Sequence, residues 1–171
     1  MKKIILIALA GLLLPLASCR RTKPQSPSNR PEKDTVALNL LEMNQRYVQA
    51  AGNELAFYVK GQDKPYVLDD MGYWYYIAKK GGSRPVSTME QVQIRQQVYL
   101  LSDSTRLCKD EQLFITPGRK EVTNAVDMCM EYLHTGDSVS ILAPWYLAYG
   151  QRGDDDILPY ACVRIELKIS E

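Results

Sequence analysis

The C-terminal end of this 171-residue chain alternates between apolar and charged side chains. A period of two residues places successive side chains on opposite faces of a strand, so the pattern predicts a final strand with one buried face. Apolar residues at even spacing from Val92 to Leu100, and again from Val139 to Ala143, predict two further strands. The apolar positions of the final strand are Val163, Ile165, Leu167 and Ile169.

A helical period marks the segment between residues 122 and 133, where apolar residues recur at steps of three and four and form one stripe. His134 and Gly136 are expected to end this helix. The stripe consists of Val122, Ala125, Val126, Cys129, Met130 and Leu133.

A second helix is predicted to begin at a cap formed by Asp34 or Thr35 and to run through about Ala50. We expect Gly52 to stop it, a shorter helix to follow from Asn53 to Val59, and the chain to be irregular as far as Asp70. Residues 35–71 thus form a helical N-terminal flank. It either packs on the main fold or serves as a dimerisation arm, and we favour packing. The sequence leaves the oligomeric state open.

The first 18 residues have the composition of an export signal. Two lysines precede an apolar stretch from Ile4 to Leu16, which is shorter than the ~20 residues needed to span a bilayer. The sequence Leu16-Ala17-Ser18-Cys19 resembles the lipobox of bacterial lipoproteins. The resemblance implies cleavage before Cys19, acylation of its thiol with a lipid such as palmitate, and attachment to a lipid membrane. An uncleaved membrane anchor is the alternative.

Residues 19–34 predict a flexible stalk, because they contain three prolines and many charges but no large apolar side chain. The remaining residues, 72–171, have the size of one domain. Basic and acidic residues nearly cancel (21 against 20) and form no basic stripe, so nucleic acid is not an expected partner.

Cysteine and histidine usage argues against a metal centre or other cofactor. With Cys19 lipidated, Cys108, Cys129 and Cys162 remain, and an odd number leaves at least one unpaired. The chain has one histidine and no Cys-x-x-Cys pair, which is too little for a zinc site. The aspartates at 154–156 lack the glycine and the spaced oxygen ligands of a calcium loop, so they predict a solvated loop.

The most informative motif runs from Pro144 to Pro159 as Pro-Trp-Tyr-Leu-Ala-Tyr-Gly-Gln-Arg-Gly-Asp-Asp-Asp-Ile-Leu-Pro. It resembles the signature loop of FKBP-type peptidyl-prolyl cis-trans isomerases, "P-x-x-L-A-Y-G-x-x-G-x-x-x-I-P-P". Residues 72–81, Gly-Tyr-Trp-Tyr-Tyr-Ile-Ala-Lys-Lys-Gly, resemble the family's opening strand. The resemblance implies an α+β fold in which a bent antiparallel sheet wraps around one amphipathic helix.

Proline isomerisation crosses a barrier of ~18–20 kcal/mol that arises from resonance in the amide. It needs neither a nucleophile nor proton transfer. An enzyme lowers the barrier by binding the twisted bond better than the planar one, in an apolar cleft with a few fixed hydrogen-bond donors. The resemblance therefore implies a site that binds proline-containing segments.

Residue by residue, the resemblance assigns substrate hydrogen bonding to the Tyr149 hydroxyl and peptide binding to the backbone at Glu121 and Val122. Ile157 and Leu158 keep the apolar end of the loop. Elsewhere the family's aromatic pocket residues and one aspartate are replaced, and the tyrosine of its second strand corresponds to Gln97 or, with a one-residue slip, to a neighbour. The replacements are Leu107, Cys108, Leu113, Val126 and Ile165.

The sequence thus predicts a lipid-anchored peptidyl-prolyl isomerase that assists the folding of exported proteins, with activity weakened by the replaced pocket residues. It is expected in the cell envelope, on the outer membrane facing the periplasm. The lipobox, the stalk and the helical flank also resemble the gliding-motility-associated FKBP-like lipoproteins of Bacteroidetes. The alternatives are an FKBP-fold binding or scaffold lipoprotein without turnover, and a chaperone.

Overall fold

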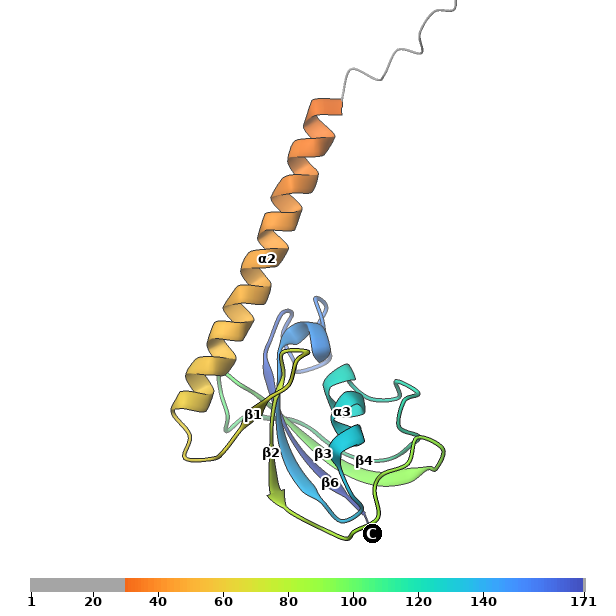
Figure 1. Cartoon of the computed structure of the whole chain (residues 1–171). Coiled ribbons are helices and arrows are strands. Elements are labelled where there is room, and N and C mark those ends of the chain that lie inside the picture. The colour runs from red at the N-terminus through yellow and green to blue at the C-terminus, as the bar shows by residue number, and fades with distance from the viewer. Residues whose placement is uncertain (1–29, 171) are drawn as a thin grey trace, which may run out of the picture. The chain divides into compact units, whose positions relative to one another are not determined.

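The computed structural model describes the backbone of residues 30–170 and the side chains from Leu38 onward (Figure 1). The signal segment, Cys19 and the first part of the predicted stalk lie outside the described residues. The elements in chain order are α2 (Arg30–Lys60), β1 (Val67–Leu68), β2 (Trp74–Lys79), β3 (Val92–Leu100), β4 (Leu107–Ile115), α3 (Asn124–Cys129), the 3-10 turn η2 (Met130–Tyr132), β5 (Ser138–Ala143), the 3-10 turn η3 (Trp145–Leu147) and β6 (Val163–Ile169).

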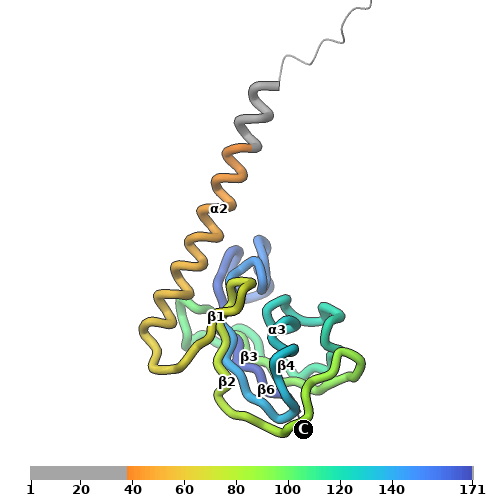
Figure 2. The backbone as a smooth tube through the Cα atoms, viewed as in Figure 1, coloured from red at the N-terminus to blue at the C-terminus, as the bar shows by residue number. Residues whose placement is uncertain are grey.

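The strands form one six-stranded sheet in the order β1-β2-β5-β6-β3-β4, and every neighbouring pair is antiparallel. Figure 2 shows the sheet curving around α3. The alternating segments predicted from the sequence coincide with β3, β5 and β6. The predicted fold class, α+β with a bent antiparallel sheet around one helix, is confirmed.

The helix α3 fills the concave face of the sheet. Its apolar stripe is buried from Ala125 to Leu133, as predicted. The regular helix is shorter than expected, because it ends at Cys129 and continues as a 3-10 turn. The carboxylate of buried Asp137 accepts the His134 amide at 2.8 Å, which removes the donor that a further helical turn would use.

The same carboxylate fixes the connection between β2 and β3. Its other oxygen accepts the amide of Gly81 at 2.6 Å, so the chain passes directly over Gly136. A Cβ atom on Gly81 would lie 2.2 Å from the Gly136 carbonyl carbon, which no side chain tolerates. Glycine is required here by the close approach of two backbones.

The helix α2 is continuous from Arg30 to Lys60, so the expectation of two helices separated at Gly52 is wrong. It begins within the predicted stalk, with Pro31 in its first turn, where the missing amide costs no hydrogen bond. At Gly52 an added Cβ would meet nothing within 4 Å, so no close contact requires glycine at this position. The neighbouring Ala51 and Leu55 are buried, and this packing holds the helix through the glycine.

Among the described residues, those from Glu42 onward form one compact unit, and residues 30–41 belong to another. In the larger unit, the C-terminal half of α2 builds a second apolar cluster on the sheet side opposite α3. The cluster consists of Ala51, Leu55, Leu101, Leu142, Trp145 and Cys162. In the smaller unit, the side chains of Leu38, Leu40 and Leu41 are exposed.

Candidate functional site

The loop from Gly150 to Pro159 is held by its own backbone. The Gly150 amide donates to the Trp145 carbonyl at 2.8 Å, and Asp154 and Ile157 exchange two hydrogen bonds across a tight turn. Gly153 has a φ of +70°, and a Cβ there would lie 2.1 Å from the Ile157 carbonyl oxygen. The turn therefore fixes Ile157 inward, where it is buried, and Leu158 outward, where it is 61% exposed.

Most of the predicted site residues meet in one apolar cluster between this loop, α3 and the sheet. Val126, Ile157 and Ile165 are fully buried in it. Ile165 lies between Val98 on β3 and Ile141 on β5, in the middle of the sheet. The cluster's half-buried members include the other predicted site residues Cys108, Leu113, Val122 and Tyr149.

The remaining predicted residues lie away from this cluster. Leu107 is 45% exposed at the start of β4, and Leu158 projects from the loop. Glu121 is exposed, and its carboxylate accepts the Thr116 amide at 2.7 Å. Its position thus secures the turn that leads into α3.

A shift in strand register explains which side chains of β3 and β4 face the site. Val98 is paired with Lys109 but Tyr99 with Leu107, so Cys108 forms a bulge. Gln97 lies on the outer side, where its amide donates to Asp110 at 2.9 Å. Gln96 is the residue that faces inward, and it is only 4% exposed.

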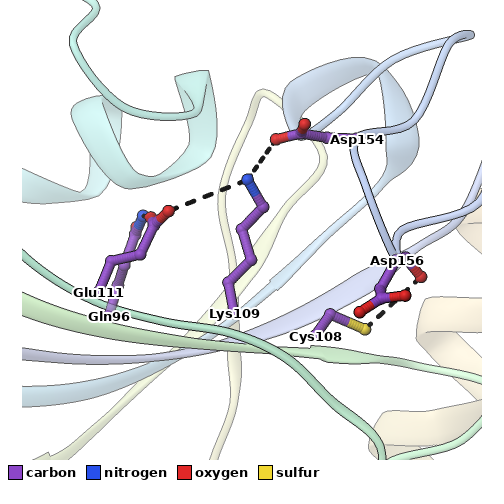
Figure 3. Close-up of polar contacts among 6 residues, drawn as sticks. All are labelled: Gln96, Cys108, Lys109, Glu111, Asp154 and Asp156. Atoms are coloured by element: carbon purple, nitrogen blue, oxygen red, sulfur yellow. Dashed lines mark hydrogen bonds and ion pairs between the residues drawn. The ribbon is translucent and has the colours of Figure 1, made fainter.

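The inward face of β4 carries charge where the resemblance implies an apolar wall (Figure 3). Lys109 forms a close ion pair with Asp154 of the loop and lies 3.9 Å from the Glu111 carboxylate. The Gln96 amide donates to Glu111 at 2.8 Å. We call Gln96, Lys109, Glu111 and Asp154 the charged row. It links β3 and β4 to the loop that holds Tyr149.

Tyr149 lies against the charged row. The Lys109 ammonium is 5.4 Å from the centre of its ring, and the Lys109 side chain is only 15% exposed. Burial raises the pKa of the Tyr149 phenol well above its usual value, and the carboxylates of Glu111 and Asp154 add to the increase. The hydrogen bond to Asp154 raises the pKa of Lys109. Tyr149 therefore stays a hydrogen-bond donor, and Lys109 stays charged.

The charged row does not stand out in the sequence. Residues 108–112 read Cys-Lys-Asp-Glu-Gln, so no apolar alternation shows which of them face inward. The two-residue spacing along the strand is the signal that could have shown which side chains face inward. Lys109 and Glu111 share the even spacing of Leu113 and Ile115, both of which pack in the core. Asp154 was assigned to a solvated loop, and its pairing with Lys109 depends on the folded chain.

The described cysteines are all free thiols. Burial raises the pKa of Cys129 and of Cys162 to about 12, so neither is a thiolate at neutral pH. The sulfur of Cys108 lies 3.8 Å from the Asp156 carbonyl oxygen. Among the described residues, no three His, Cys, Asp or Glu side chains come together in a way that could hold a metal ion.

No helix in the described part of the chain is both long enough and apolar enough to cross a membrane.

The fold is similar to several solved structures of FKBP-type proteins. FkpA from Escherichia coli matches with a TM-score of 0.61 and 12% identity, over 100% of this chain and 81% of its own. The peptidyl-prolyl cis-trans isomerase from Pseudomonas syringae pv. tomato matches with a TM-score of 0.58 and 18% identity, over 72% of this chain and 93% of its own.

A third match is the N-terminal domain of FKBP42 from Arabidopsis thaliana, with a TM-score of 0.57 and 15% identity, over 63% of this chain and 91% of its own. No protein-family model and no curated protein sequence matches the chain. At these identities the similarity establishes the fold, which is that of the FKBP-type isomerases.

Proposed function

We propose that this chain is a lipid-anchored peptidyl-prolyl cis-trans isomerase of low turnover that assists the folding of exported proteins. The observation that carries the proposal is the position of Tyr149. Its half-buried ring packs against the apolar cluster that contains the buried side chains of Val126, Ile157 and Ile165, which we call the apolar floor, and the loop that follows it is closed by backbone hydrogen bonds. An apolar floor beneath a fixed hydrogen-bond donor is what isomerisation requires.

In this mechanism the proline ring packs against the half-buried edge of the apolar cluster, beside Tyr149, Leu113 and Val122, and the Tyr149 hydroxyl donates to the carbonyl before the proline. Twisting the amide removes its resonance, so the twisted form has less charge separation and is favoured by apolar surroundings. The hydroxyl holds the carbonyl in place while the proline side rotates. No covalent bond forms or breaks. The raised pKa of Tyr149 keeps the donor proton on the phenol throughout the neutral range.

We expect low turnover because of the residues that surround Tyr149. Aliphatic residues such as Val126 and Ile165 leave less aromatic surface against the proline ring than the family pattern has. Lys109 and Glu111 also bring fixed charges close to the reacting amide. Charges that contact the planar and the twisted amide equally add binding without lowering the barrier.

The proposed anchor is a lipid on Cys19, which would place the domain on the outer membrane facing the periplasm. The lipobox-like sequence before Cys19 supports it. We expect mass spectrometry of the mature protein to find an acylated N-terminal Cys19. A Cys19→Ser variant is the control and should keep its leader. An unmodified, uncleaved Met1 on the natural protein would refute the anchor.

The second candidate is a binding or scaffold lipoprotein with the same fold, or a chaperone. The charged row favours it, since the side chain of Lys109 covers the ring of Tyr149 and would have to move before a proline could reach the ring. Such a protein would bind peptides without accelerating their isomerisation.

An isomerisation assay with a proline-containing peptide separates the two candidates. We expect the mature chain to accelerate isomerisation, and Tyr149→Phe to lower kcat/KM about tenfold, the loss expected for one hydrogen bond in a partly desolvated site. Tyr99→Phe is the matched control, because Tyr99 lies on the outer sheet face under Arg164. It should leave kcat/KM unchanged. If the peptide binds but isomerises only at the uncatalysed rate, the second candidate is favoured.

A further inference from the structure

On β4 and the loop from Gly150 to Pro159, carboxylates outnumber the cations that pair with them. The nearby carboxylates are those of Glu111, Asp154, Asp155 and Asp156, and the cations that pair with them among the described residues are Lys109 and Arg106. Lys109 is paired with Asp154, and Arg106 lies 3.5 Å from Asp156. Two of the four carboxylates therefore lack a cation of their own.

Glu111 has unused capacity to accept hydrogen bonds. One of its oxygens accepts the Gln96 amide at 2.8 Å. The other lies 3.9 Å from the Lys109 ammonium, which is beyond hydrogen-bond distance. The Glu111 side chain is 38% exposed, so its free oxygen is within reach of a ligand. A carboxylate with a free, solvent-exposed oxygen favours a cationic donor.

Gln96 gives a second and independent indication of a missing donor. It is 4% exposed, and its buried side-chain carbonyl has no hydrogen-bond partner among the described residues. The amide cannot be turned round to correct this, because its oxygen would then face the Glu111 carboxylate. Buried acceptors normally have a partner, so this one has room for a donor from outside the chain, which is a water in the free protein and a ligand group in a complex.

The charged row already holds one cation of the right kind. The Lys109 ammonium lies between carboxylates and 5.4 Å from the Tyr149 ring centre, as Figure 3 shows for its polar partners. Aromatic faces attract guanidinium and ammonium groups in this arrangement. An arginine or lysine from a peptide would find the same aromatic and carboxylate surroundings, with Glu111 as an exposed acceptor next to Gln96.

We propose that the site selects proline segments in which the residue before the proline is arginine or lysine. This rests on the proposed function, in which Tyr149 holds the carbonyl of that residue. Its side chain then begins beside the Tyr149 ring and is directed to the charged row. The apolar floor accepts the proline, and the row accepts the basic neighbour.

The test uses three peptides that differ only in the residue before proline, which is arginine, leucine or glutamate. Binding to the full mature chain is measured by fluorescence anisotropy, and isomerisation is measured on the same peptides. We expect the arginine peptide to bind about tenfold more tightly than the glutamate peptide, with leucine between them. The difference should shrink as salt is added, because exposed charges are screened.

Glu111→Gln should abolish the arginine preference while the leucine peptide still binds as it does to the natural chain, which shows that the variant is folded. Asp110→Asn is the matched control. It removes one negative charge from the residue directly before Glu111 on β4. The side chain of Asp110 lies on the outer face of the sheet, where it pairs with Arg95. The preference should survive in this variant.

The outcomes separate this inference from the isomerase proposal. Equal binding of the three peptides together with catalysed isomerisation would overturn the inference and leave the isomerase intact. An arginine preference in binding without catalysis would support the inference and overturn the isomerase. Loss of the preference in Asp110→Asn would show a general effect of net charge and would overturn the inference.

Discussion

Neighbouring carboxylates on β4 have different electrostatic environments, because successive side chains of a strand face opposite ways. Asp110 accepts two hydrogen bonds from the Arg95 guanidinium, at 3.0 and 2.8 Å, and one from Gln97 at 2.9 Å. These bonds lower the pKa of Asp110 to about 2. Glu111, one residue later, accepts one hydrogen bond and faces the candidate site. The outer carboxylate is fully paired, and the inner one is available.

The pairing of Asp110 predicts a pH effect that can be measured directly. A lowered pKa in the folded state stabilises the fold above the ordinary pKa of about 3.9, and the gain disappears as the pH falls to about 2. Arg95→Gln should therefore raise the pKa of Asp110 in a carbon-detected NMR titration. The stability difference between this variant and the natural chain should disappear at about pH 2.

Arg84→Gln serves as the control for this titration, since it removes an exposed guanidinium that pairs with Glu90 instead. It should leave the titration of Asp110 unchanged. If Asp110 titrates near pH 4 in the natural chain, the paired geometry is incorrect.

At the scale of elements, local sequence signals predicted the half-buried elements well. Strands β3 and β6 and the stripe on α3 each have one buried face, and their period alone located them. The even spacing of Val139, Ile141 and Ala143 located β5 as well, although both of its faces are buried. Gly52 misled the prediction because a glycine in a helix is a weak local signal. It costs roughly 1 kcal/mol, which the burial of Leu55 outweighs. Packing against a distant part of the chain keeps α2 continuous through Gly52.

Continuity of α2 through Gly52 can be tested by a single substitution. Gly52→Ala should raise the free energy of unfolding by about 0.5–1 kcal/mol, because alanine restricts the unfolded chain and an added Cβ meets no atom within 4 Å. Chemical denaturation would measure the change. If Gly52 instead ended the helix in a left-handed conformation, alanine would destabilise the protein.

Gly118→Ala is the matched control for this substitution. Gly118 also has room for a Cβ, but its φ is +85°. Alanine there should lower the stability, since its side chain disfavours that conformation. The opposite signs of the two variants separate backbone conformation from packing.

At the scale of the whole molecule, the fold could be read from the sequence more completely than the site. The signature loop lies within one continuous stretch, so its glycines and Tyr149 could be recognised together. The charged row joins residues from β3, β4 and the loop, and Asp154 is 45 residues from Lys109. Contacts of this kind depend on strand register and on the bulge at Cys108. Neither follows from local periodicity.

The whole molecule has the fold of the FKBP-type isomerases, with charged side chains beside the candidate site. In the proposed function, catalysis depends on the apolar floor and Tyr149, and selection of the peptide depends on the charged row. The two can be separated experimentally, because catalysis and binding have different readouts. The catalytic claim is central, since the proposed selection acts on the same site.

Exchange NMR of a proline-containing peptide, in excess over the full mature chain, tests this claim most directly. Uncatalysed isomerisation takes tens to hundreds of seconds, too slow to link the cis and trans signals during the measurement. We predict exchange peaks between them whose rate rises in proportion to the protein concentration and falls with Tyr149→Phe. An exchange rate that stays at the uncatalysed value at every protein concentration would contradict the account.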